Sequence, residues 1–135
     1  MISRMYNLLM RHTALLDSSL KMTHEMFQAT CRGDINLVNF EADNRERVMK
    51  ILEKFQSEIE NMLATLKPDE ITQDIVEIIK AWQVDVNNWA IELDAIDVKS
   101  SEVLEAQKLE TTKEIATIFT SRQQFKGYNL NNTKK

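Results

Sequence analysis

The chain contains only two glycines and one proline among its 135 residues, and this scarcity limits what it can fold into. Sheets and long loops need frequent tight turns, and glycine and proline are among the residues that form them. With 43% hydrophobic residues, the chain has enough apolar side chains for a packed core. The composition therefore predicts an all-α protein made of long helices.

Apolar residues at intervals of three, four and seven predict three long helices. The expected helices span about residues 5–32, 35–66 and 69–97. Gly33 can adopt the left-handed conformation that ends a helix, and Asp34 can cap the amides that begin the next one. We therefore expect Arg32-Gly33-Asp34 to be a helix corner rather than an adhesion ligand. Because short corners make consecutive helices lie antiparallel, and because Pro68 suits a first helical position, the prediction is an antiparallel helical bundle.

The apolar pattern weakens in the last third of the chain. Polar residues occupy positions where a heptad repeat would place apolar ones, namely Ser100, Gln107 and Thr111. We expect a weakly packed helix over about residues 101–125, which either continues the third helix or folds back as a fourth. Four segments of similar length favour folding back, whereas the absence of Gly and Pro from Asp97 to Ser101 favours continuity. The predicted units are one helical bundle domain over residues 1–125 and a disordered tail over residues 126–135.

The third predicted helix carries two apolar stripes. The stripe that suits the core of a bundle is almost uninterrupted, and it consists of Ile71, Ile75, Ile78, Trp82, Val86, Trp89, Leu93 and Ile96. The second stripe repeats every seven residues on another side, at Val84, Ile91 and Val98. Another element must shield this second stripe from water. The alternatives are a fourth helix, a second copy of the chain, or a helix of another protein. We predict that this stripe, with the neighbouring Ile79, binds a partner.

Charge is distributed unevenly along the chain. Residues 67–98 carry two basic and eight acidic side chains, a net charge of −6, whereas residues 99–135 carry a net charge of +3. Opposite charges attract the C-terminal segment to the third helix by a screened, reversible force. This is compatible with a detachable regulatory cover, and equally with an ordinary solvated surface. The apolar residues of the expected cover are Val103, Leu104, Ile115, Ile118 and Phe119.

Arg45 interrupts the apolar face of the second predicted helix. One interpretation is that its methylene stem lies on that face while the guanidinium reaches water or Glu41, four residues earlier. The other is that Arg45 holds an ion pair across the bundle or with a partner. The sequence leaves both interpretations open.

No group of residues in the sequence suggests catalysis. Neither His12 nor His24 has a Glu three residues before it, as helical di-iron sites require. His24 and Cys31 are two helical turns apart, about 10 Å along the axis, which is too far for a shared metal without help from other helices. The Lys-Gly pair that follows the histidine in phosphotransfer bundles is missing after both histidines. We therefore expect no enzymatic activity, no metal and no cofactor.

Charge and hydropathy limit the remaining classes of partner. A net charge of −4 argues against a nucleic-acid binder that relies on a basic face. Cys31 is the only cysteine, so no intramolecular disulfide is expected. The first residues lack the cleavage pattern of a signal peptide, and no stretch approaches the ~20 apolar residues that span a bilayer. We expect a cytoplasmic protein that binds no nucleic acid and spans no membrane.

The segment from Met26 to Leu52, MFQATCRGDINLVNFEADNRERVMKIL, resembles the FliT-type flagellar export chaperones. In that family the first helix ends in an apolar-rich stretch and a Gly-Asp corner. The next helix carries a Glu and then an Arg before an aliphatic run. The matching residues here are Gly33, Asp34, Glu41, Arg45 or Arg47, and the run Val48 to Leu52. The ending Lys126-Gly127-Tyr128-Asn129 is also similar to endings in this group.

The resemblance implies a cytoplasmic chaperone of type III secretion in flagellum biogenesis. Such a chaperone binds an export substrate, chiefly the C-terminal region of the filament-cap protein, and prevents its premature assembly. It then delivers the substrate to the export machinery, and in that family a C-terminal helix can cover the binding surface and be displaced. The alternative is a structural coiled-coil homodimer or scaffold module with no client, in which the second stripe of the third helix is permanently buried.

Overall fold

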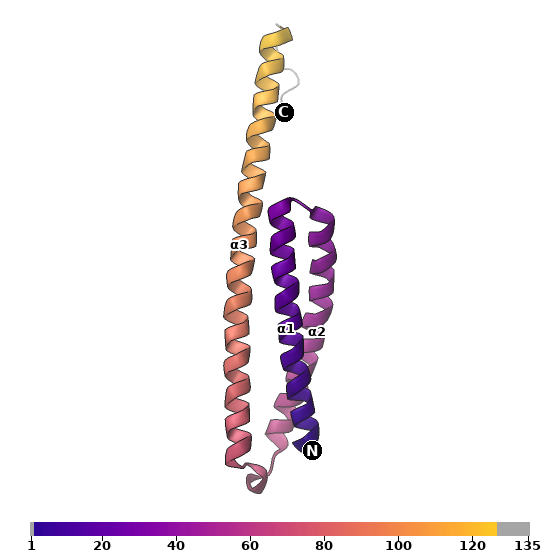
Figure 1. Cartoon of the computed structure of the whole chain (residues 1–135), viewed down its shortest axis with the longest axis vertical. Coiled ribbons are helices and arrows are strands. Elements are labelled where there is room, and N and C mark those ends of the chain that lie inside the picture. The colour runs from indigo at the N-terminus through magenta and orange to yellow at the C-terminus, as the bar shows by residue number, and fades with distance from the viewer. Residues whose placement is uncertain (1, 127–135) are drawn as a thin grey trace. The chain divides into compact units, whose positions relative to one another are not determined.

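The computed structural model describes residues 2–126, with side chains as far as residue 118. The described residues form three long helices and one short turn of 3-10 helix, with no strand among them (Figure 1). The elements are α1 (Ile2–Arg32), α2 (Ile35–Thr65), η1 (Pro68–Glu70) and α3 (Gln73–Lys126). The prediction of an all-α bundle of long helices is confirmed.

The helix α3 is continuous through residues 97–101 and ends at Lys126. Of the two arrangements that the sequence leaves open, continuation of the third helix is therefore the one found. Without glycine or proline in this stretch, nothing interrupts the backbone hydrogen bonds of the helix. The chain divides into two units, the first ending at Ser100 and the second beginning at Ser101. The single domain over residues 1–125 stays a prediction, and residues 127–135 of the predicted tail lie outside the described part.

The corner between α1 and α2 has the predicted geometry. Gly33 has a positive φ of 73°, its N–H donates to the carbonyl of Thr30, and the N–H of Asp34 donates to the carbonyl of Ala29. These two bonds form the Schellman motif that ends many helices at a glycine. The Asp34 carboxylate then accepts a hydrogen bond of 3.1 Å from the Leu37 N–H and caps α2. The Arg32-Gly33-Asp34 triplet is thus a helix corner.

The second corner differs from the prediction, because α3 begins at Gln73 rather than near residue 69. Pro68 begins the 3-10 turn η1 instead, and the Glu70 carboxylate accepts a hydrogen bond of 3.0 Å from the Lys67 N–H. The hydroxyl of Thr72 then accepts from the Ile75 N–H at 3.3 Å. These side-chain bonds close one turn and cap the next helix, which delays the start of α3.

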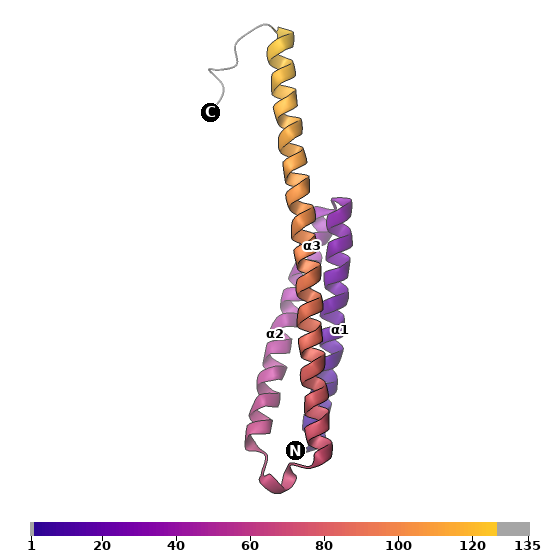
Figure 2. The ribbon, with the colours of Figure 1, turned by 90° about the vertical axis from the view of Figure 1, so that its left-hand side faces the viewer.

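Within the first unit, α1, α2 and the N-terminal part of α3 lie side by side (Figures 1 and 2). Two successive antiparallel corners make α1 and α3 parallel. One hydrophobic cluster draws buried residues from all three helices, each at most 7% exposed. Its members are Met5, Leu8, Leu9, Ile59, Ile75 and Trp82. The core therefore lies along the axis between the three helices.

Two indole hydrogen bonds fix the alignment of α1 against α3. The Nε1–H of Trp82 donates to Nδ1 of His12 at 3.1 Å, and the Nε1–H of Trp89 donates to Oγ of Ser19 at 2.8 Å. Both bonds join residues that are 70 positions apart, so the two parallel helices keep one register over a full heptad. His12 and Ser19 are buried, and each buried polar group left unpaired by a shifted register would cost about 1–3 kcal/mol.

Arg45 of α2 connects the three helices. Its Nη1 donates to Oδ1 of Asp97 on α3 at 2.7 Å and to Oγ1 of Thr23 on α1 at 3.2 Å. Thr23 is buried, whereas the side chains of Arg45 and Asp97 are 22% and 38% exposed. Of the two interpretations of Arg45 that the sequence allows, the ion pair across the bundle is the one found.

We expect Arg45→Met and Asp97→Asn to destabilise the bundle non-additively, because each substitution removes the same ion pair. Since water reaches both side chains, the coupling free energy in a double-mutant cycle should be about 1 kcal/mol. Urea unfolding of the wild type, the two single variants and the double variant measures this value. Single effects that add to within about 0.3 kcal/mol would contradict the ion pair.

Burial lowers the pKa of His12 below its ordinary value of 6.5. A neutral ring is also what the Trp82 bond needs, because Nδ1 must be free of a proton to accept it. With a lowered pKa in the folded state, the unfolded state binds more protons below pH 6.5. The contribution of His12 to stability is therefore complete above pH 6.5 and is lost as the pH falls toward the folded pKa.

The variant His12→Gln should remove this pH dependence, because glutamine offers an acceptor for the Trp82 indole and does not titrate. Between pH 7.5 and pH 5.5 we expect the free energy of unfolding of the wild type to fall relative to that of the variant. The slope of this difference should be at most about 1.4 kcal/mol per pH unit. Urea unfolding at each pH measures it, and His24→Gln, at an exposed histidine, is the control. Parallel curves for the wild type and His12→Gln would refute the role of His12.

Candidate functional site

Three aliphatic side chains of α3 lie on its outer side. Val84, Ile91 and Val98 are 56%, 70% and 49% exposed, whereas Trp82 on the core side is 7% exposed. We call these three residues the α3 stripe. At 1.5 Å per residue, the stripe is about 21 Å long, which is close to four turns of helix. It is the exposed surface that the seven-residue repeat predicts.

Ile79, which the sequence analysis groups with these residues, lies elsewhere. Its side chain is half-buried and packs against the hydrophobic cluster of the first unit. Ile79 comes four residues after Ile75 and three before Trp82, both of them core residues. These spacings place it beside the core face of the helix, so Ile79 is not part of the α3 stripe.

The residues predicted to form a regulatory cover all lie on α3 beyond Ser100. Leu104, Ile115 and Ile118 are between 43% and 55% exposed, and Val103 is half-buried. Leu109, which the prediction did not include, is 58% exposed. The side chain of Phe119 lies outside the described part of the chain. A covering role for this segment stays a prediction.

A groove with a volume of about 470 Å³ runs between α1 and α3. The buried side chains of Leu9 and Trp82 line it. Met10 and Ile78 also line it and are 74% and 39% exposed. Met10 is not among the predicted site residues, although its position outside the core spacing of α1 is a sequence signal that marks it as exposed.

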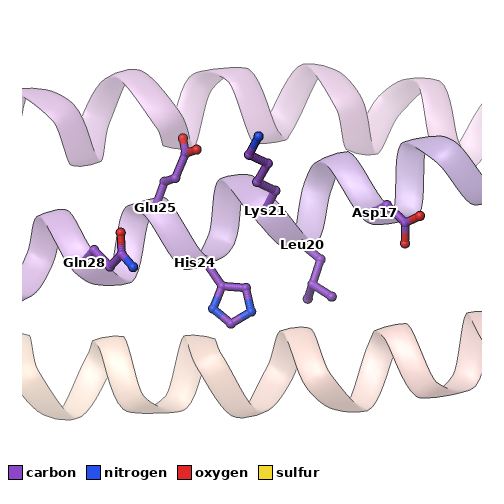
Figure 3. A pocket seen from close by; sticks show the side chains of 6 residues that line it. All are labelled: Asp17, Leu20, Lys21, His24, Glu25 and Gln28. Atoms are coloured by element: carbon purple, nitrogen blue, oxygen red, sulfur yellow. The ribbon is translucent and has the colours of Figure 1, made fainter.

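A second depression of about 440 Å³ continues along α1 and shares Asp17 with the groove (Figure 3). Figure 3 shows Leu20 and His24 pointing toward α3, while Glu25 points toward the opposite neighbour, α2. Nε2 of His24 lies 3.9 Å from Oε1 of Glu92 on α3, and both side chains are more than half exposed. The two depressions meet at Asp17 and follow one another along the outer edge of α1, and we call this strip the channel; α3 lines only its first part, the groove.

Glu41 is buried between the helices, although it is a carboxylate. Burial raises its pKa above the ordinary value of 4.5, and a hydrogen bond with Glu25 of α1 raises it further. Arg45 is likewise engaged inside the bundle. Two of the residues that carry the family resemblance therefore lie inside the bundle, where Arg45 links the three helices. They are not part of the exposed apolar surface.

Neither a metal-binding group nor a membrane span is found in the described part of the chain. No group of three or more His, Cys, Asp and Glu side chains there is arranged to hold a metal ion. None of the helices described is both long enough and apolar enough to cross a bilayer. The thiol of Cys31 is exposed.

No protein-family model, curated protein or solved structure matches this chain. The fold and surfaces define a class, an all-α bundle that exposes aliphatic side chains on its third helix and in a groove beside it. The function must therefore be argued from these surfaces.

Proposed function

We propose that this protein is a cytoplasmic, non-catalytic chaperone of flagellar type III export, which binds an export substrate and prevents its premature assembly. The observation that carries the proposal is the α3 stripe. Its three aliphatic side chains are about half exposed or more and are aligned along one side of a rigid helix. The resemblance of Met26 to Leu52 to the FliT-type chaperones gives the class of client.

The α3 stripe suits the apolar face of an amphipathic helix, which also repeats about every seven residues. Full burial of an aliphatic side chain contributes about 1.5–3 kcal/mol, and these three are already partly covered. Together they supply on the order of 3–5 kcal/mol, against an association cost of about 4–15 kcal/mol. The stripe alone therefore gives weak binding, and the client must add contacts around it. Reversible binding suits a chaperone that has to release its client.

The client that the family resemblance favours is the C-terminal region of the filament-cap protein. In this proposal the chaperone shields that region until it transfers the client to components of the export apparatus. The segment of α3 from Val103 onward is the proposed regulatory cover; because α3 is continuous, the helix must bend beyond Ser100, or reach a second copy of the chain, before these aliphatic side chains can cover an α3 stripe.

A structural homodimer is the second candidate, and the same stripe favours it. A stripe that repeats every seven residues on a long helix is also what a coiled-coil partner of the same sequence requires. In that case the stripe is buried permanently and no client is bound. The two candidates differ in what a single substitution in the stripe does to the oligomeric state.

The variant Ile91→Asp should abolish client binding and leave the helix content unchanged. A charge at the most exposed position of the stripe would have to be buried in the complex, which we expect to weaken binding at least about 100-fold, or roughly 2.7 kcal/mol. Titration calorimetry with the filament-cap protein of the same genome measures the affinity, and circular dichroism measures the helicity. Ile51→Asp, at an exposed isoleucine of α2, is the matched control and should bind normally.

Unchanged affinity of Ile91→Asp for the filament-cap protein would contradict the chaperone proposal. Loss of helicity would instead mean that Ile91 is a core residue. Analytical ultracentrifugation, which measures the oligomeric state, distinguishes the structural homodimer from the chaperone. A tight wild-type dimer that Ile91→Asp converts to a monomer, with no binding of the filament-cap protein by either form, would favour the structural homodimer.

A further inference from the structure

We propose that the groove between α1 and α3 is a second docking site, whose occupant is a basic amphipathic helix of another protein. The residues of this groove are different from those of the α3 stripe, and α1 contributes five of the nine. The inference therefore does not depend on what the stripe binds. It rests on the shape, the length and the charge of the groove.

The shape of the groove suits the side of a helix. Leu9 and Trp82 are buried, and Met10 and Ile78 line the groove with exposed aliphatic surface. Met10 is the most exposed of the large hydrophobic residues in the described part of the chain. Contact with a docked helix would remove this surface from water, which is the main source of affinity in helix-in-groove recognition.

Small residues keep the middle of the groove open. Ala14 on α1 and Ala81 on α3 line it and are both exposed. Ala14 lies four residues after Met10, and Ala81 lies three residues after Ile78, so each helix presents a large and then a small side chain one turn later. Large side chains of an incoming helix can therefore pack above the alanines while its backbone stays close to the bundle.

The length of the channel sets the length of the occupant. Asp17 borders both the groove and the second depression, which extends along α1 to Gln28 (Figure 3). From Met10 to Gln28 the two depressions follow 18 residues of α1, or about 27 Å, which corresponds to five turns of helix, and α3 lines only the part as far as Asp17. Because the walls are helices with paired backbone groups, they offer no edge to an extended strand. A helix of about 18 residues fits.

The charge of the channel selects a basic occupant. Asp17 and Asp85 line the groove from α1 and α3, and both are exposed. None of the described residues that line the groove is basic. Farther along, Lys21 lines the second depression together with Glu25, so the channel as a whole stays acidic. A Lys or Arg placed one turn beyond the apolar contacts of the occupant would lie between the two aspartates.

The same charges disfavour a second copy of this chain as the occupant. The exposed apolar part of α3 beyond Ser100 is the chain's own candidate for such a helix. Residues 101–126 of α3 carry four glutamates and four basic residues, a net charge of zero, so this helix brings no excess of positive charge to the two aspartates. A basic helix from another protein supplies that excess and is favoured by charge complementarity.

Two synthetic peptides of 18 residues test the proposal. Both carry one apolar face of Leu and Ala with helical spacing, and they differ only in the flanking positions, which are Lys in one and Glu in the other. Fluorescence anisotropy of each labelled peptide with the full chain should give at least about tenfold tighter binding of the Lys peptide, equivalent to roughly 1.4 kcal/mol. The double variant Asp17→Lys/Asp85→Lys should reverse this preference. Both aspartates are exposed, so the fold should be unaffected.

Two further variants locate the bound peptide. Met10→Asp should abolish binding of the Lys peptide, whereas Ile91→Asp in the α3 stripe should leave it unchanged within about twofold. Loss of binding in Ile91→Asp alone would overturn the proposal, because the peptide would then occupy the stripe. Equal affinities for the two peptides, or a preference that the double variant does not reverse, would also overturn it. So would a wild-type dimer in analytical ultracentrifugation that Met10→Asp dissociates, because a second copy would then fill the groove.

Discussion

The constant offset of 70 residues between α1 and α3 determines what this bundle buries and what it exposes. Apolar packing alone does not fix such an alignment, because aliphatic side chains at heptad spacing pack almost equally well one heptad away. Two indole N–H groups and their acceptors, His12 and Ser19, distinguish the native alignment. Either bond has a modest net value, but a shift of one heptad would pair one indole with the other acceptor and leave one indole N–H and one acceptor without their native partners. The polar contacts thus specify the alignment, and the apolar core supplies most of the stability.

This alignment has a direct consequence for the surface. Trp82 and Trp89 face α1. The residues two positions later, Val84 and Ile91, therefore lie on the opposite side of α3. The first unit cannot turn the α3 stripe inward without breaking the indole bonds. The same alignment places Met10 and Ile78 along the groove between α1 and α3, on a different side of α3 from the stripe. Both apolar surfaces are therefore consequences of one internal register, and a bundle that keeps it has two faces available for partners.

Much of this arrangement could be predicted from periodicity. The scarcity of turn residues predicts the helices, Gly33 marks the first corner, and the repeat at Ile91 predicts an exposed stripe. The buried polar residues could not be predicted, because His12 and Ser19 interrupt the apolar pattern and their partners lie 70 residues away. The groove was missed for a related reason. The position of Met10 outside the core spacing of α1 marks it as exposed, but only the position of α3 shows that it lines a groove.

Thiol labelling measures most directly whether the internal register exposes the stripe. In a Cys31→Ser background, Ile91→Cys and Ile96→Cys introduce single thiols at positions that are 70% and 7% exposed. In the free protein under native conditions, the thiol at position 91 should react with a maleimide about as fast as a thiol in a short peptide. The thiol at position 96 should react at least about 100-fold more slowly, because it becomes accessible only when the bundle opens. Equal protection at the two positions would contradict the proposed architecture, because it would mean that the α3 stripe is enclosed before any partner arrives.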